Sequence, residues 1–186
     1  MTHPPSPLWH PFTQHALADA EILIEKAQGS KLVTKDGRQI IDGISSWWVN
    51  THGHCHPEIV KAVPEQAAQL DQLIVAGCTH KPAEAFAEAL LRFVPRGLDY
   101  VFLSDSGSTP VEAALKMAIG AHAHLGKPRS VIVAMEHGYH GDTFGTMAAG
   151  APSVFNNIYA QYLFSVERIP FPEKNHEAQT IDAFKN

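Results

Sequence analysis

Two short apolar runs with a helical segment between them constrain the fold of this chain more than any other feature. The runs are YVFL at residues 100–103 and VIVAM at residues 131–135, and the helical pattern spans residues 110–125. Strands that are apolar throughout and alternate with helices are typical of a parallel sheet covered on both faces. The sequence therefore predicts an α/β fold. Two strands cannot close a domain of this kind, so we expect the sheet to be continued by residues beyond 186.

The N-terminal part of the chain has a different pattern. Short strands are expected at residues 21–26, 31–34 and 39–42. Asp36 and Gly37 lie between the last two strands and supply the Asp-Gly pair of a tight hairpin turn. This region is therefore predicted to contain a β-hairpin.

Helical spacing follows the predicted strands. From Pro57 onward apolar residues recur at helical intervals as far as Ile74. Pro57 is acceptable in a first helical turn, whereas Pro64 falls inside the pattern and predicts a kink or a break. A second helix is expected to begin near Pro82 and to end before Pro95. Beyond residue 150 the periodicity is weak and predicts no particular element.

The charge and the cysteines exclude several classes of protein. The chain has 14 Lys and Arg against 19 Asp and Glu, a net charge of -5, and so lacks the basic surface that nucleic acid or an anionic membrane would need. Cys55 and Cys78 make no disulfide framework and are expected to be either small buried side chains or incidental thiols. Residues 1–8 lack a signal-peptide pattern, and no apolar run approaches the roughly 18 residues of a membrane span. We expect a cytoplasmic protein that binds neither nucleic acid nor membrane.

Residues 104–112, SDSGSTPVE, lie where the first apolar run ends and the next helix begins. Thr109 followed by Glu112 has the spacing of a capping box, in which each residue satisfies a free amide of the helix end. Pro110 between them fits the first helical position. The sequence therefore predicts that Thr109 caps the helix.

Such a helix end is suited to an anion. The amides of Gly107, Ser108 and Thr109 would point outward from the positive end of the helix dipole, and the two hydroxyls add further donors. Gly107 would let a ligand approach the backbone closely, and ligands of open α/β sheets bind at the carboxyl ends of the strands. The pattern predicts a site for a phosphate monoester; the alternative is a capped helix without a ligand. Neither a Walker loop nor a G-x-G-x-x-G fingerprint is present.

A second loop is expected at the same edge of the sheet. Residues 138–143, GYHGDT, follow the second apolar run. Flanking glycines would expose Tyr139 and His140 toward whatever the phosphate turn holds. A planar aromatic ring beside an anion-binding turn indicates a flat phosphorylated cofactor. The alternative is a structural turn in which His140 caps a carbonyl.

Trp47 and Trp48 are adjacent, after two serines. In an extended segment neighbouring side chains face opposite ways, so the two rings cannot both enter one core. One of them could line a pocket, where aromatic rings supply flat apolar walls. The alternative is that both are core or interface residues.

His52, His54 and His56 alternate beside Cys55, a pattern that could suggest a metal site. No carboxylate or cysteine pair elsewhere completes a convincing set of ligands, and the segment leads as a loop into the helix at Pro57. We therefore expect no metal.

Four segments, taken in order, resemble one family closely. They are WHPFTQ at residues 9–14, DGISSWW at residues 42–48, DSGS at residues 105–108 and GYHGDT at residues 138–143. The family is that of the adenosylmethionine–8-amino-7-oxononanoate aminotransferases, class III aminotransferases of fold type I. The resemblance extends from about Trp9 to Ala149. The paired tryptophans and the Trp-His-Pro opening resemble this family more than the ornithine or 4-aminobutyrate aminotransferases.

The resemblance implies a cofactor and a division into domains. The cofactor would be pyridoxal 5'-phosphate, with Gly107 and Ser108 holding its phosphate and Tyr139 lying over its ring. The fold-type-I likeness implies that residues 1–45 contribute to the small domain. Residues 46–186 would then begin the large, doubly wound cofactor-binding domain.

The resemblance also implies a substrate pocket. Trp47 would line it with Trp48 nearby, and Tyr139 would touch the substrate. Phe12 would belong to the same pocket, but the family often has tyrosine at that position. A phenol offers a hydrogen bond that Phe12 cannot make.

The catalytic groups of the family have no match in this chain. Its Schiff-base lysine, the acidic partner of the pyridinium nitrogen and the arginine that recognises the substrate carboxylate all lie beyond position 186 in the family. Lys116, Lys127 and Lys174 match none of these positions. The chain is therefore interpreted as an N-terminal fragment that is inactive alone, and its catalytic residues are unknown.

The complete enzyme is expected to act on small molecules as a homodimer. It would transfer an amino group to 8-amino-7-oxononanoate and make 7,8-diaminononanoate for biotin, with S-adenosylmethionine or lysine as the donor. Two alternatives stay open: another class III ω-aminotransferase, and a truncated, non-catalytic fragment.

Overall fold

The computed structural model describes residues 6–19 and 21–185, and the chain divides into two compact units. The first unit is Met1–His80 and the second is Lys81–Asn186. No helix in the described residues is both long and apolar enough to cross a membrane. The expected division at residues 45 and 46 into small and large domains stays a prediction.

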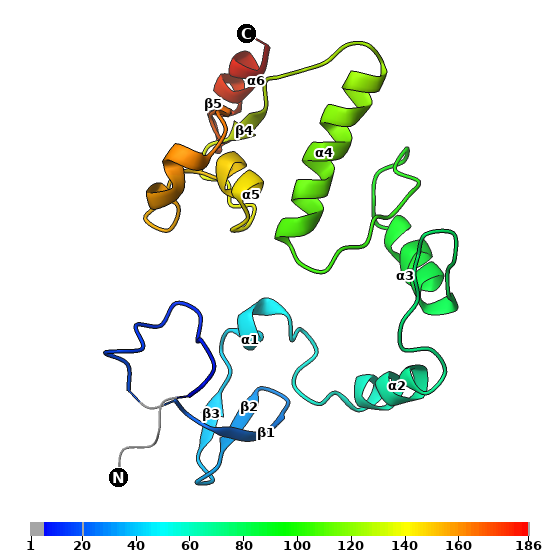
Figure 1. Ribbon diagram of the computed structural model, residues 1–186, viewed down its shortest axis with the longest axis vertical. Helices are drawn as coiled ribbons and strands as arrows, with labels where there is room; N and C mark the ends of the chain where they lie inside the picture. Colours follow the sequence, from blue (N-terminus) through cyan, green and yellow to red (C-terminus); the bar gives the residue numbers. More distant parts are fainter. Residues whose placement is uncertain (1–5, 20, 186) are drawn as a thin grey trace. The chain divides into compact units, whose positions relative to one another are not determined.

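The first unit contains a three-stranded antiparallel sheet (Figure 1). Its strands, in the order β1-β2-β3, are Ile24–Gln28, Lys31–Thr34 and Gln39–Ile41. The hairpin turn predicted between β2 and β3 is present: Gly37 has a φ of 86° and its amide donates to the carbonyl of Thr34 at 2.9 Å. Glycine suits this turn because a positive φ crowds the Cβ of other residues.

Two helices follow in the first unit. A short turn, α1, spans Ser45–Trp48, and α2 spans Pro57–Ala67. α2 runs through Pro64 without the expected break and ends soon after it. The apolar pattern that continues to Ile74 is not helical.

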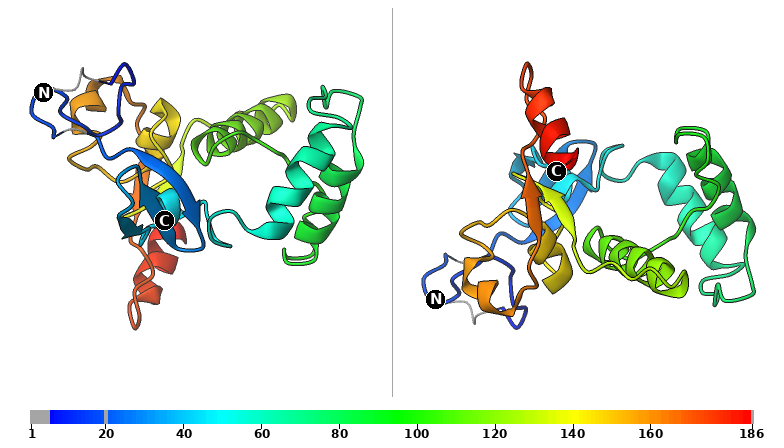
Figure 2. Two further views of the ribbon diagram at one scale, coloured as in Figure 1. Left: turned by 90° about the horizontal axis from the view of Figure 1, so that it is seen from below. Right: turned by 90° about the horizontal axis from the view of Figure 1, so that it is seen from above.

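The second unit contains a parallel strand pair, of which one strand coincides with the apolar run predicted at residues 131–135 (Figure 2). Its elements in chain order are α3 Lys81–Leu91, α4 Ser108–His124, β4 Val133–Met135, α5 Phe144–Ala149, the 3-10 helix η1 Asn157–Tyr162, β5 Glu167–Ile169 and α6 Glu177–Lys185. β4 and β5 are hydrogen-bonded in parallel, with Ala134 opposite Arg168. The weak pattern after residue 150 did not predict β5.

The strand predicted at residues 100–103 is wrong. The structure gives this segment no strand pairing within the described part of the chain, and Tyr100 is 96% exposed. A parallel strand is stable only when a neighbouring strand satisfies its amides and carbonyls. β4 pairs with β5 along one edge, and residues 100–103 do not pair with its other edge in the described structure.

The most buried element is α5. Residues Gly145–Ala149 are all buried, and α5 packs against α4. Each end of α5 meets a charge that complements the helix dipole. Glu112 accepts the amide of Gly145 at 2.7 Å, and the guanidinium of Arg168 donates to the last carbonyls of the helix, including that of Ala148 at 3.0 Å.

Of the two alternatives expected for the cysteines, burial is wrong. Cys55 and Cys78 are both exposed and free, because each lies in an irregular segment rather than in a packed strand or helix.

The carboxylate of Glu112 makes the stability of the second unit depend on pH. The hydroxyl of Thr143 donates to it at 2.5 Å and, with the amide of Gly145, holds the pKa of Glu112 below its ordinary value of 4.5. A lowered folded-state pKa stabilises the folded unit fully above pH 4.5, and this contribution is lost as the pH falls through the folded pKa.

Urea unfolding at pH 7 and at pH 3 tests this contribution. The free energy of unfolding should fall less between these two pH values in Glu112→Gln than in the unsubstituted chain. Glu173→Gln, an exposed control whose carboxylate has no hydrogen bond among the described residues, should lose as much unfolding free energy as the unsubstituted chain. An equal decrease in Glu112→Gln and the unsubstituted chain would contradict the prediction.

Candidate functional site

The N-terminus of α4 presents free amides in the second unit. α4 begins at Ser108, with Gly107 as its N-cap. Within the described residues, the amides of Gly107 and Ser108 have no hydrogen-bond acceptor. A Cβ built on Gly107 would meet nothing within 4 Å, so the space beside these amides is open. A helix of 17 residues places its positive dipole end here.

The predicted capping box is wrong. The amide of Thr109 donates to the hydroxyl of Ser106 at 3.2 Å, so Ser106 satisfies this amide and Thr109 lies inside the helix. Glu112 does not reach back to the helix end, because its carboxylate is bound by Thr143 and Gly145. The amide of Thr109 is therefore not available to an anion, unlike those of Gly107 and Ser108.

Hydroxyl groups surround the same helix end. The hydroxyl of Thr109 donates to the carboxylate of Asp105 at 2.7 Å, and this bond lowers the pKa of Asp105. Ser108 accepts the amide of Asp142 at 3.2 Å and keeps its own proton for donation. Ser108 therefore adds one further donor to the two free amides.

The loop of residues 138–143 lies against α4, at Ser108. Gly141 makes this contact possible: its φ is 122°, and a Cβ there would lie 2.0 Å from the hydroxyl oxygen of Ser108. In the same loop the phenol of Tyr139 donates to the carboxylate of Asp142 at 2.8 Å, which raises the pKa of Tyr139. The ring of Tyr139 is 70% exposed. The structure thus brings Ser108 and the loop that carries Tyr139 together.

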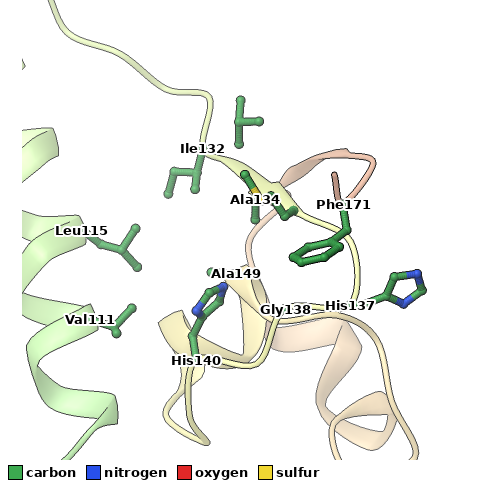
Figure 3. Close-up of a pocket in the computed structure, with 11 residues that line it drawn as sticks. Val111, Leu115, Ile132, Ala134, His137, Gly138, His140, Ala149 and Phe171 are labelled. Carbon is green, nitrogen blue, oxygen red and sulfur yellow. The ribbon is translucent and has the colours of Figure 1, made fainter. Parts of the chain in front are cut away.

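His140 does not cap a carbonyl. Its ring makes no hydrogen bond within the described chain and lines a cavity of ≈ 570 Å³ between α4 and β4 (Figure 3). Val111 and Leu115 of α4 point into this cavity from one side, and Ile132 lies across from them. The lining is mainly apolar and does not include Gly107 or Ser108, so the cavity is separate from the N-terminal end of α4.

The other candidate residues lie in the first unit. The rings of Phe12 and Trp47 stack with their centroids 5.6 Å apart, and those of Trp47 and Trp48 are 6.3 Å apart. All three side chains are exposed, which contradicts a core role for both tryptophans. The segment is not extended either: Ser45–Trp48 forms a turn with positive φ at every residue. Phe12, Trp47 and Trp48 therefore form an exposed aromatic cluster.

His52, His54 and His56 do not converge on one point. His54 bonds through Nε2 to the carboxylate of Asp42 at 2.8 Å, and the rings of His52 and His56 meet edge to face at 5.9 Å. No group of metal-binding side chains occurs within residues 6–19 and 21–185.

The sequence did not predict the contacts of three acidic residues. Asp42 bonds to His54 in the first unit, and in the second unit Glu112 bonds to Thr143 and the amide of Asp142 bonds to Ser108. All three residues stand inside the motifs described above, but spacing alone does not show which partners an acidic residue will meet.

Comparison with known proteins places the chain in a family. The family model for the class III aminotransferases matches residues 13–185. The chain belongs to the class III aminotransferases. Members of this family use pyridoxal phosphate.

Relatives of this class III aminotransferase chain carry one recurring name. An adenosylmethionine-8-amino-7-oxononanoate aminotransferase of Synechococcus elongatus is 48% identical over 176 residues, which are 95% of this chain and 42% of the relative. One of Nitratidesulfovibrio vulgaris is 39% identical over 89% of this chain and 31% of the relative. The chain therefore spans less than half the length of these relatives.

Solved structures agree with the fold. The aminotransferase of the same name from Methanocaldococcus jannaschii superposes with a TM-score of 0.85 at 31% identity, over 95% of this chain and 42% of that one. An omega transaminase of Pseudomonas jessenii in complex with PMP superposes with a TM-score of 0.80 at 23% identity, over 89% of this chain and 38% of that one. At this identity the likeness shows the fold alone. The predicted α/β, fold-type-I class is confirmed.

The helix end in this aminotransferase chain fits a phosphate monoester. Gly107 and Ser108 offer two free amides, a hydroxyl and open space at the positive end of α4. A phosphate dianion needs several converging donors and no side chain in its place. No lysine of this chain lies within that turn.

Proposed function

We propose that the complete protein is an aminotransferase that converts 8-amino-7-oxononanoate to 7,8-diaminononanoate in biotin biosynthesis. The observation that carries this proposal is the 48% identity, over 95% of this chain, to a relative named for that reaction. The name of this relative includes adenosylmethionine, so S-adenosylmethionine is the proposed amino donor, and lysine is the alternative. We also propose a cytoplasmic homodimer, by likeness to the family.

The geometry of the second unit supports the roles that we propose for its residues. Gly107 and Ser108 would hold the phosphate of pyridoxal phosphate through their amides and the Ser108 hydroxyl. Tyr139 would lie beside the ring, and its hydroxyl is held by Asp142 at 2.8 Å. When bound, the cofactor supplies an electron sink for the carbon from which the amino group departs. What this chain contributes is binding and orientation.

The first unit would supply part of the substrate pocket. Trp47 stacks on Phe12, and together with Trp48 they give flat apolar surface. The acceptor carries a long aliphatic chain, which suits such a surface better than a polar one. Phe12 offers no hydrogen bond, so polar recognition of the acceptor must come from other residues.

An activity assay of the protein at its cellular length tests the proposal. The purified protein should form 7,8-diaminononanoate from 8-amino-7-oxononanoate, and its kcat/KM should exceed that for simple ω-amino acids by at least about 100-fold, the value of roughly 3 kcal/mol of differential binding. Parallel reactions with S-adenosylmethionine and with lysine identify the donor. Preference for a simple ω-amino acid would show another ω-aminotransferase, and an intact mass equal to that of residues 1–186 without activity would show a non-catalytic protein.

A further inference from the structure

The turn that carries the two tryptophans is left-handed throughout. Ser45, Ser46, Trp47 and Trp48 have φ angles of 49°, 48°, 69° and 70°. None of them is glycine, and in this conformation the Cβ of an L-residue crowds the following carbonyl oxygen. A run of such residues persists only where surrounding contacts hold it.

One carboxylate provides those contacts. Asp42 accepts the hydroxyl of Ser46 at 2.9 Å and Nε2 of His54 at 2.8 Å, both on the same oxygen. The backbone amides of Ser46 and Ile44 also bond to it, and together these donors lower the pKa of Asp42 to about 2. The Asp42 side chain is only 6% exposed, so water does not replace these donors easily.

The histidine partner is itself fixed by the backbone. His54 and Gly29 exchange two backbone hydrogen bonds. The amide of Gly29 donates to the carbonyl of His54 at 2.9 Å, and the amide of His54 donates to the carbonyl of Gly29 at 2.7 Å. Gly53 makes this approach possible, because a Cβ there would lie 3.1 Å from Cα of Gly29. The amide of Asp42 in turn donates to the carbonyl of Ser30 at 2.9 Å. Asp42 therefore ties the strained turn to the end of the β1-β2 hairpin.

We propose that Asp42 is the positioning residue for Trp47. By holding Ser45–Trp48 left-handed, it sets the direction of the Trp47 ring and keeps it stacked on Phe12, 13° from parallel. The further consequence, that Asp42 thereby shapes the pocket for the acceptor, rests on the proposed function. Asp42 touches neither substrate nor cofactor in this role.

A spectroscopic experiment on the chain tests the positioning itself. The rings of Trp47 and Trp48 are close and inclined at 55°, so they should give an exciton couplet in circular dichroism that Trp47→Phe removes. Asp42→Asn replaces an acceptor oxygen by a donor amide and should remove most of the couplet. Asp71→Asn, at an exposed residue without a hydrogen bond among the described residues, should leave it unchanged.

A rescue separates positioning from a general structural role. Ser45 is partly exposed and its side chain makes no hydrogen bond in the described structure, so Ser45→Gly removes the left-handed penalty at that residue without removing a hydrogen bond. The double variant Asp42→Asn/Ser45→Gly should therefore regain much of the couplet. A couplet that survives Asp42→Asn, or one that the glycine does not restore, would overturn the proposal.

Kinetics of the protein at its cellular length test the consequence for the pocket. Asp42→Asn should raise KM for 8-amino-7-oxononanoate roughly tenfold, while its pyridoxal phosphate content stays unchanged. An unchanged KM in a variant that has lost the couplet would overturn the pocket part of the proposal. If the unsubstituted protein does not use this acceptor, the proposed function fails alone, and the couplet and its rescue still decide the role of Asp42.

Discussion

Gly107→Asp is expected to weaken the binding of pyridoxal phosphate by about 100-fold or more in the protein at its cellular length. The introduced carboxylate would accept the free amides at the N-terminus of α4 and would also repel the phosphate. Loss of two charge-assisted hydrogen bonds, each worth about 1.5–3 kcal/mol, accounts for this magnitude. The helix itself should persist, because Gly107 has a φ of -62° that any residue adopts and because aspartate is a good N-cap.

Gly107→Asn is the matched control for charge. Its side chain has the same size as that of aspartate and the same capping oxygen, but no charge. Gly107→Asn should therefore weaken the binding of pyridoxal phosphate by only about tenfold, the equivalent of one lost hydrogen bond of roughly 1.4 kcal/mol. Titration of each apoprotein with pyridoxal phosphate, followed by absorbance, gives the Kd values. A Gly107→Asp protein with the original Kd would remove the phosphate role from this turn.

Gly141→Ala should have the largest effect on stability. The new Cβ would lie 2.0 Å from the hydroxyl oxygen of Ser108 and 3.0 Å from its Cα, at a φ of 122° that side chains rarely adopt. Steric overlap and backbone strain each cost about 1–3 kcal/mol, so the second unit should lose about 2–6 kcal/mol of unfolding free energy. The hydrogen bond from Asp142 to Ser108 should be lost as the loop moves away from α4.

Gly120→Ala is the control glycine for this comparison. Gly120 lies inside α4, and a Cβ there would meet nothing within 4 Å. Alanine should therefore stabilise α4 by about 0.5–1 kcal/mol through its higher helix propensity. Urea unfolding of the two variants should move the midpoint in opposite directions. A midpoint for Gly141→Ala equal to that of the unsubstituted chain would contradict the contact between the loop and α4.

Several features could be predicted because they depend on local chemistry. The Asp-Gly turn, the helix after residue 107 and the apolar strand at β4 follow from turn residues, helical spacing and burial patterns that neighbouring residues impose on each other. The motifs that resemble the aminotransferases were equally local, and the family model confirms the family they indicated.

Other features depended on partners distant in the sequence. The segment at residues 100–103 is apolar enough for a strand, but strand pairing requires a neighbour. Glu112 has the spacing of a capping residue, yet Thr143 and Gly145 bind its carboxylate instead. Two competing partners for one carboxylate cannot be ranked from spacing, because the free energy depends on distances that only the folded chain sets.

By itself the sequence determined the family, the α/β class and the place of the turn before α4, because these are properties of contiguous residues. Only the tertiary structure decided which groups at that turn are free to bind and how Trp47 is held. The amides of Gly107 and Ser108 remain open while that of Thr109 is taken by Ser106. Trp47 points as it does because Asp42 meets His54 and Ser46 around a left-handed turn. Hydrogen bonds are short-ranged and directional, so their partners are fixed only once the chain has brought them within 3 Å or so.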